Sequence, residues 1–137
     1  MKNNKFIWLF VGLLILDQAT KFLFFGKEIN LIGELLRIDS SMNTGIAFGM
    51  MQGMNLVWII VSIIAGILIW IYFKKYPICV ALIEVGIIGN LIDRIYFGYV
   101  RDFIGMYIWP NFNIADACNT IGILILVYYL WKEDHSI

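Results

Sequence analysis

The feature that most constrains this chain is the uninterrupted apolar run from Leu56 to Phe73, which contains no charged residue. At ~1.5 Å per residue, a helix of this length approaches the ~30 Å thickness of a bilayer's hydrocarbon core. Hydrophobic residues make up 61% of the 137-residue chain, whereas a soluble domain of this size must turn much of its surface towards water. The sequence therefore predicts an integral membrane protein.

Three further stretches have the length and composition of membrane spans. With the first run, they predict a mainly α membrane protein that forms one domain over residues 1–137. We expect four transmembrane helices at about 6–25, 56–73, 77–95 and 114–131, joined by outer loops at 26–55 and 96–113. Gly26 to Gln52 is too polar to span and carries turn residues, which predicts a small extracytoplasmic β-rich cradle between the first two helices.

The charges indicate how these spans are oriented. The formal net charge is zero, so no overall basic field points to nucleic acid as a partner. Lysines collect on the side of the two termini, and fewer cations lie in the opposite loops. The two groups are Lys2, Lys5, Lys74, Lys75 and Lys132, against Lys27, Arg37 and Arg101. This excess predicts that both termini are cytoplasmic.

Two aspartates, Asp102 and Asp116, lie at the edges of long apolar runs on the outer face. A carboxylate at a membrane boundary is costly to place and is a candidate functional group by default. Taken singly, Asp102 is compatible with an ordinary loop carboxylate. Asp116 is compatible with a charge in the first turn of the last helix, where Asn113 is an equally good cap. Their occurrence together at one face favours a site built from two sides.

Other polar groups accompany these aspartates. Asp17 and Lys21 are four residues apart on the first helix and are expected to pair inside a polar interior. Asn43 and Gly45 belong to a stretch of small residues that fits either a plain turn or a close approach of the backbone to an extended ligand.

The third apolar segment carries a stripe of small and polar residues at helical spacing. Its members are Gly86, Gly89, Asn90 and Asp93. Small residues allow close helix packing, and polar ones form hydrogen bonds across helices. Arg94 follows Asp93 directly, so we expect a charged scaffold at this helix end. Glu84 lies on another face of the same helix, and the sequence suggests no partner for it.

The chemistry that fits two facing carboxylates is acid–base catalysis. One ionised aspartate would activate a water, while the other, protonated, would polarise a peptide carbonyl, so that the pair shares one proton. No cofactor or metal is expected, because the only histidine, His135, lies near the C-terminus and Cys79 and Cys118 are interpreted as packing residues. The predicted reaction is peptide hydrolysis of the aspartic type.

Five motifs in order along the chain resemble the lipoprotein signal peptidase (signal peptidase II) family of bacteria. They are Asp17-Gln18 with Lys21, Asn43-Thr44-Gly45, Gly89 to Arg94, Gly98 to Phe103, and Phe112 to Asp116. The resemblance implies a membrane-embedded aspartic endopeptidase of the bacterial cytoplasmic (inner) membrane. Its substrates would be diacylglyceryl-modified prolipoproteins, cut just before the lipidated cysteine to release the signal peptide.

By motif position, the resemblance implies that Asp102 and Asp116 are the catalytic pair. It also implies a set of residues that bind substrate or brace the site: Asp17, Lys21, Asn43, Gly45, Asn90, Asp93, Arg94 and Asn113. We expect a monomer that contacts membrane lipid and no nucleic acid. Arg101 departs from the family pattern, because an apolar residue is common before the catalytic aspartate, and its charge is expected to lower the pKa of Asp102.

Two other functions are compatible with the residues. A small proton-coupled transporter would use intramembrane carboxylates near the bilayer midplane, and Glu84 is the acid that fits this description. The other acids crowd one interface, which argues against transport. A non-catalytic scaffold for lipoprotein insertion would differ from a peptidase only in lacking activity.

Overall fold

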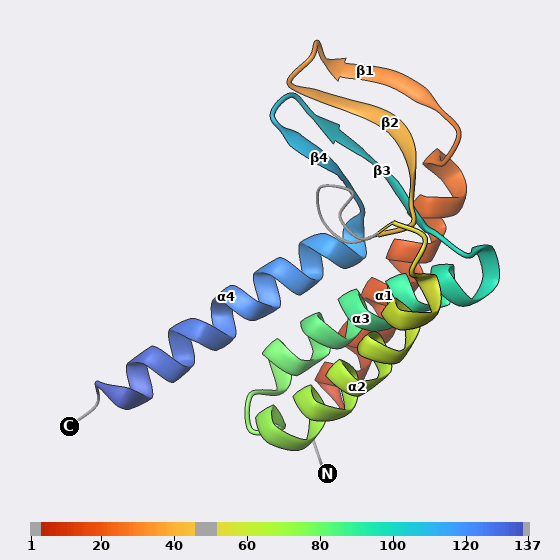
Figure 1. Cartoon of the computed structure of the whole chain (residues 1–137). Helices are drawn as coiled ribbons and strands as arrows, with labels where there is room; N and C mark the ends of the chain where they lie inside the picture. The colour runs from red at the N-terminus through yellow and green to blue at the C-terminus, as the bar shows by residue number, and fades with distance from the viewer. Residues whose placement is uncertain (1–3, 46–51, 136–137) are drawn as a thin grey trace.

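A computed structural model of the chain describes residues 4–45 and 52–135. Within them the fold is mainly helical, with a small sheet at one end of the helices (Figure 1). The elements are α1 (Lys5–Phe24), β1 (Glu28–Ile32), β2 (Leu36–Asn43), α2 (Asn55–Phe73), α3 (Pro77–Phe97), β3 (Val100–Met106), β4 (Trp109–Phe112) and α4 (Ile114–Asp134). The start of α1 and the end of α4 lie at the end of the helices that is remote from the sheet (Figure 1).

Within the described residues, 3 helices, namely α1, α2 and α4, are long and apolar enough to cross a membrane. No residue of α2 is buried, and large apolar side chains such as Ile60 and Trp70 are exposed along it. Such a surface is stable against lipid tails and not against water. The 21-residue helix α3 falls outside this set, since it carries Glu84, Asp93 and Arg94. It packs against all the other helices and is the centre of the bundle.

Close approach of α3 and α4 depends on glycines. A Cβ atom added to Gly86 would lie 2.6 Å from the Cβ of Asn119, and one added to Gly122 would lie 2.8 Å from Cγ1 of Ile83. Real Cβ atoms do not approach so closely, so only glycine fits at these two positions. The packing predicted from the small residues of α3 is confirmed at Gly86.

The sheet is larger than the sequence predicted. It is antiparallel with the order β1-β2-β3-β4, so the second outer loop contributes half of it. The strands predicted between the first two helices are present as β1 and β2, and β3 and β4 extend their sheet. A two-stranded hairpin is marginal alone and gains stability from such further strands. In the β2–β3 pairing, Ser41 is the partner of Asp102 and Asn43 is the partner of Val100. The first loop therefore forms one wall beside Asp102.

The turn from α3 into β3 is made by Gly98. Its φ of +80° is in the left-handed region, and its N–H donates to the carbonyl oxygen of Arg94 at 3.2 Å. A glycine in this conformation ends a helix at little cost. The chain therefore reverses at once, and β3 begins two residues later beside the end of α3.

Candidate active site

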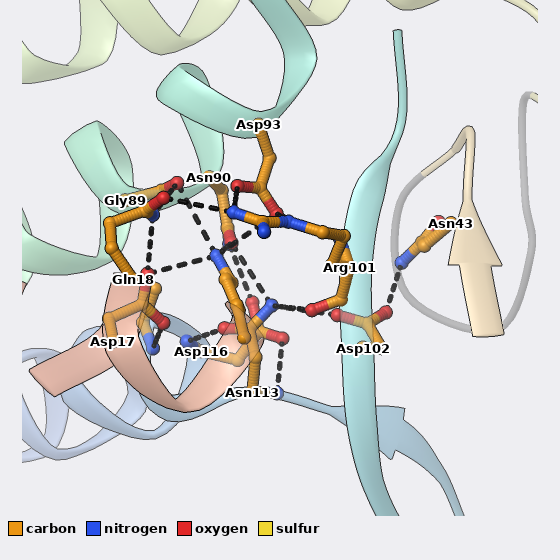
Figure 2. Close-up of polar contacts among 12 residues, drawn as sticks. Asp17, Gln18, Asn43, Gly89, Asn90, Asp93, Arg101, Asp102, Asn113 and Asp116 are labelled. Atoms are coloured by element: carbon orange, nitrogen blue, oxygen red, sulfur yellow. Dashed lines mark hydrogen bonds and ion pairs between the residues drawn. The ribbon is translucent and has the colours of Figure 1, made fainter. Parts of the chain in front are cut away.

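Asp102 lies on β3, is 1% exposed, and is held by two amide side chains (Figure 2). Asn113 Nδ2 donates to Asp102 Oδ1 at 2.7 Å, and Asn43 Nδ2 donates to Asp102 Oδ2 at 3.1 Å. Both donors come from other elements, Asn43 from β2 and Asn113 from the N-cap of α4. The carboxylate is therefore fixed in orientation by two neutral amides, and no cation of the described residues forms an ion pair with it.

Asp116 lies in the first turn of α4. Its Oδ1 accepts from Asn90 Nδ2 at 2.7 Å, and its Oδ2 accepts from the backbone N–H of Asn113 at 3.2 Å. In return, Asn113 Oδ1 accepts from the backbone N–H of Asp116 at 2.9 Å, which completes a capping box. The capping roles suggested for both residues are confirmed, and they coexist with a role in the site, because Asn113 bonds both aspartates.

The surroundings of Asp102 change its acidity. Burial and, after it, the negative charge of Asp116 raise the pKa of Asp102 to about 7, against the opposing hydrogen bonds from Asn43 and Asn113. The expected lowering by Arg101 is wrong. Arg101 Nη2 lies 2.7 Å from Oδ1 of Asp93 and donates to Gln18 at 3.0 Å, so its charge is already paired. The aspartate pair can therefore retain a proton at neutral pH.

Asp102 and Asp116 line one cavity of about 410 Å³ beneath the sheet. Its walls come from β2, β4 and α4 together with β3. The other lining residues are Ser41, Met42, Asn43, Gln52, Trp109, Pro110, Asn111, Phe112, Asn119, Thr120 and Ile123. A cavity of this size can hold several residues of an extended peptide beside the two carboxylates.

A buried network of charged side chains connects α1 and α3 beside the two aspartates. Lys21 Nζ lies 3.0 Å from Oδ2 of Asp17 and 3.4 Å from Oδ2 of Asp93, and all three side chains are fully buried. Lys21 also donates to Asn90 Oδ1 at 3.1 Å. Asp17 Oδ1 in turn accepts from the backbone N–H of Ala115 at 2.8 Å, which ties α1 to the start of α4. The predicted Asp17–Lys21 pair is confirmed, and its charges are compensated as burial requires.

Arg94 and Gly45 lie on the far side of Asn43. Arg94 Nη2 donates to the carbonyl oxygen of Gly45 at 2.8 Å, and the N–H of Gly45 donates to Asn43 Oδ1 at 3.0 Å. The second bond is an Asx-type turn, which is the plainer of the two interpretations of this stretch. Together these bonds orient the amide of Asn43 so that its nitrogen points at Asp102.

Glu84 is separate from this site. It lines a different cavity, of about 730 Å³, between α1, α2 and α3, and its Oε1 is buried with no partner among the described residues. Cys79 and Cys118 are both buried and unbonded, and Cys79 packs with Ile83 and Leu126, so the packing role predicted for the cysteines is confirmed.

Sequence reasoning left some residues of the site unassigned. Gln18 donates to Asp17 Oδ2 at 2.9 Å and to the carbonyl oxygen of Gly89 at 3.1 Å, so it is part of the network. Asn119 and Thr120 face the cavity one turn after Asp116. Helical spacing of three and four residues from Asp116 is the signal that could have found them.

The chain is similar over most of its length to known proteins. The family model described as Signal peptidase (SPase) II matches residues 9–132. A lipoprotein signal peptidase of Halothermothrix orenii is 35% identical, over 88% of this chain and 91% of the relative. One from Caldicellulosiruptor bescii is 41% identical, over 87% of this chain and 85% of the relative.

A solved structure described as a bacterial membrane enzyme has the same fold. It superimposes with a TM-score of 0.90 at 31% identity, over 98% of this chain and 92% of the other. Sequence and fold thus agree along nearly the whole chain, and the resemblance suggested by the five motifs is confirmed. The chain belongs to the signal peptidase II family.

Proposed function

We propose that this chain is an aspartic endopeptidase whose catalytic residues are Asp102 and Asp116. As a member of the signal peptidase II family, it is a membrane protease that removes signal peptides from lipoproteins. The observation that carries the aspartic mechanism is the pairing of these two carboxylates in one cavity, with Asn113 bonded to both and the pKa of Asp102 near 7.

The proposed reaction uses the single proton that the pair shares. The ionised aspartate takes a proton from a water, which attacks the scissile carbonyl carbon, while the protonated aspartate donates a hydrogen bond to the carbonyl oxygen. The C–N bond of the resulting tetrahedral intermediate then breaks, and the leaving nitrogen takes up a proton from the pair. The products are a carboxylate on the signal peptide and a free amine on the cysteine.

The donors around the pair favour this shared proton. Asn43 and Asn113 supply neutral hydrogen bonds to Asp102, which orient its carboxylate and lower its pKa less than a bonded cation would. Asn90 orients the carboxylate of Asp116 in the same way. Lys21 contacts Asn90 Oδ1 and so turns the amide nitrogen of Asn90 towards Asp116. Lys21 therefore fixes the orientation of the Asn90 amide, and this amide lies between the ammonium group and the carboxylate of Asp116.

The substrates we propose are diacylglyceryl-modified prolipoproteins, cut just before the lipidated cysteine. The protein acts as a monomer of one domain. We propose that α3 is a fourth span, because it is 21 residues long and surrounded by α1, α2 and α4, with Asp93 and Arg94 at its sheet end. With four spans, the lysine excess favours cytoplasmic termini and supports a position of the sheet and cavity at the outer face.

A gel-shift cleavage assay tests this function. Purified protein in detergent would be mixed with a diacylglyceryl-modified prolipoprotein or its unlipidated form, with a chelator present. We expect cleavage of the lipidated form alone, and its loss in Asp102→Asn and in Asp116→Asn. Normal cleavage by either variant would overturn the assignment of the pair, and no cleavage by the folded parent protein would overturn the function.

The transporter alternative gains no support from the comparisons, all of which name signal peptidases or a membrane enzyme. Glu84 is the acid on which it depended, and it lies in a separate cavity from the two aspartates.

A further inference from the structure

Asn119 faces the same cavity as the two aspartates, one helical turn deeper along α4. It follows Asp116 by three residues, which places the two side chains on one face of the helix and about 4.5 Å apart along its axis. Thr120 and Ile123 continue this wall of the cavity. A peptide that presents its scissile bond to Asp116 and continues along α4 therefore passes Asn119.

The side-chain oxygen of Asn119 is not engaged by the part of the chain that the structure describes. Its Oδ1 is buried and has no partner among the described residues. Neighbouring polar groups on the cavity wall are already used, since Thr120 Oγ1 donates to the carbonyl oxygen of Asp116 at 2.9 Å and Asn111 Nδ2 donates to that of Asp39 at 2.6 Å. A buried acceptor without a donor destabilises the fold, so this oxygen is a place where a ligand N–H would be stabilised.

The side chain is held in place by the helix behind it. An added Cβ on Gly86 would lie 2.6 Å from Cβ and 2.8 Å from Cγ of Asn119, so the stem of Asn119 fills the space that this glycine leaves. The stem cannot swing away, and only the terminal amide can turn. That terminal torsion is broad, so rotation about it can turn the oxygen towards the cavity.

We propose that Asn119 is a substrate-positioning residue whose Oδ1 accepts a hydrogen bond from a backbone N–H of the signal peptide. An extended chain advances about 3.3 Å per residue, so the N–H lies one or two residues before the scissile bond. The inference rests on the proposed function and adds a contact that reads the peptide backbone, independent of side-chain sequence. It assigns the α4 wall of the cavity to the signal-peptide side of the cut.

The substitution that tests this role is Asn119→Leu. Leucine branches at Cγ as asparagine does, and it removes a buried oxygen that has no partner, so the fold should be as stable as before or more stable. We expect KM for the lipidated substrate to rise about three- to tenfold, the loss of one neutral hydrogen bond, with kcat changed less than about twofold. Ile121→Ala is the matched control, because Ile121 is 50% exposed on the same helix and lines neither cavity.

A series of synthetic lipopeptides makes the test specific. In each, one peptide bond on the signal-peptide side of the scissile bond is replaced by an ester, which deletes its N–H. At one of the first two positions, the ester should cost the parent protein about three- to tenfold in kcat/KM and cost Asn119→Leu nothing further. A lipopeptide with ether-linked alkyl chains lacks the lipid carbonyls. This change should alter kcat/KM by the same factor in the parent protein and in Asn119→Leu.

Two results would overturn the inference and leave the peptidase intact. One is an identical ester penalty in the parent protein and in Asn119→Leu at every position. The other is an effect on kcat/KM that differs between the two proteins for the ether-linked lipid and for none of the backbone esters. That result would assign Asn119 to the lipid headgroup. Failure of the parent protein to cleave the unmodified lipopeptide is a different result, and it would overturn the proposed function on which the inference rests.

Discussion

Lys21 Nζ donates to Asn90 Oδ1 at 3.1 Å and thereby fixes which end of the Asn90 amide faces Asp116. The same ammonium group compensates Asp17 and Asp93, both of which are fully buried. It also donates to the carbonyl oxygen of Gly89 at 3.3 Å, so one cation on α1 serves four partners on two helices. Its removal has consequences both for stability and for the orientation of a donor to Asp116.

Lys21→Met should destabilise the protein strongly. It leaves Asp17 without its cation and Asp93 with Arg101 alone, and breaking a buried ion pair costs about 3–5 kcal/mol. We expect a clear fall in Tm, which circular dichroism in detergent would measure. The double variant Lys21→Met with Asp17→Asn should recover part of the lost Tm. Absence of any recovery would contradict this account. Lys75→Met is the control, because the Lys75–Glu133 pair is exposed and should matter little.

Substitutions at Asn113 should separate stability from activity. Asn113→Ala removes a helix cap, at about 0.5–2 kcal/mol, and a donor to Asp102. Asn113→Ser restores a capping oxygen but is too short to reach Asp102 as asparagine does. We expect Ser to recover the Tm that Ala loses, while cleavage stays at least about tenfold below the parent in both variants. Recovery of activity together with Tm would show that Asn113 acts through the helix alone.

The raised pKa of Asp102 predicts a pH dependence of stability. Its ordinary value is 3.8 and its value in the folded protein is about 7, so the folded state holds this proton more tightly than the unfolded state does. The contribution to stability is complete below about pH 4 and is lost as the pH rises through about 7. Chemical unfolding in detergent across this range should show the slope, and Asp102→Asn should make it shallower.

Activity should fall above neutral pH, because the pair then loses the proton it shares. Asn43→Leu removes a hydrogen bond that lowers the pKa of Asp102, so the falling limb of kcat/KM should move to higher pH. Arg101→Lys is the matched control, since Arg101 is paired with Asp93, and its limb should stay where it is in the parent protein. A limb that stays at the parent's pH in Asn43→Leu would show that this amide does not set the acidity of Asp102.

A methyl group at Gly122 should disturb helix packing. The Cβ of Gly122→Ala would lie 2.8 Å from Cγ1 of Ile83 and 3.1 Å from its backbone nitrogen, so α3 and α4 must separate, at about 1–3 kcal/mol. Gly12→Ala meets nothing within 4 Å on α1 and should raise Tm slightly through helix propensity. Equal effects of the two variants on Tm would contradict the close α3–α4 contact.

The helices, and the residues that the structure brings together around the two aspartates, were largely predictable from the sequence, because their signals are local. Apolar runs mark the helices, and the spacing of Asp17 and Lys21 is enough to pair them. The strands β3 and β4 were not predicted, because their stability comes from pairing with β2, which is distant in sequence. The partner of Arg101 was also missed. It is Asp93 across the turn at Gly98, and only the geometry of that turn brings the two together.

The capping box between Asn113 and Asp116 gives the enzyme an early point of failure. Helix ends open more readily than helix centres, and local opening needs far less free energy than unfolding of the whole chain. When the first turn of α4 frays, Asp102 loses a donor and Asp116 loses its position in the same event. Heating should therefore abolish cleavage reversibly, at temperatures where the membrane helices are still fully folded in the bilayer.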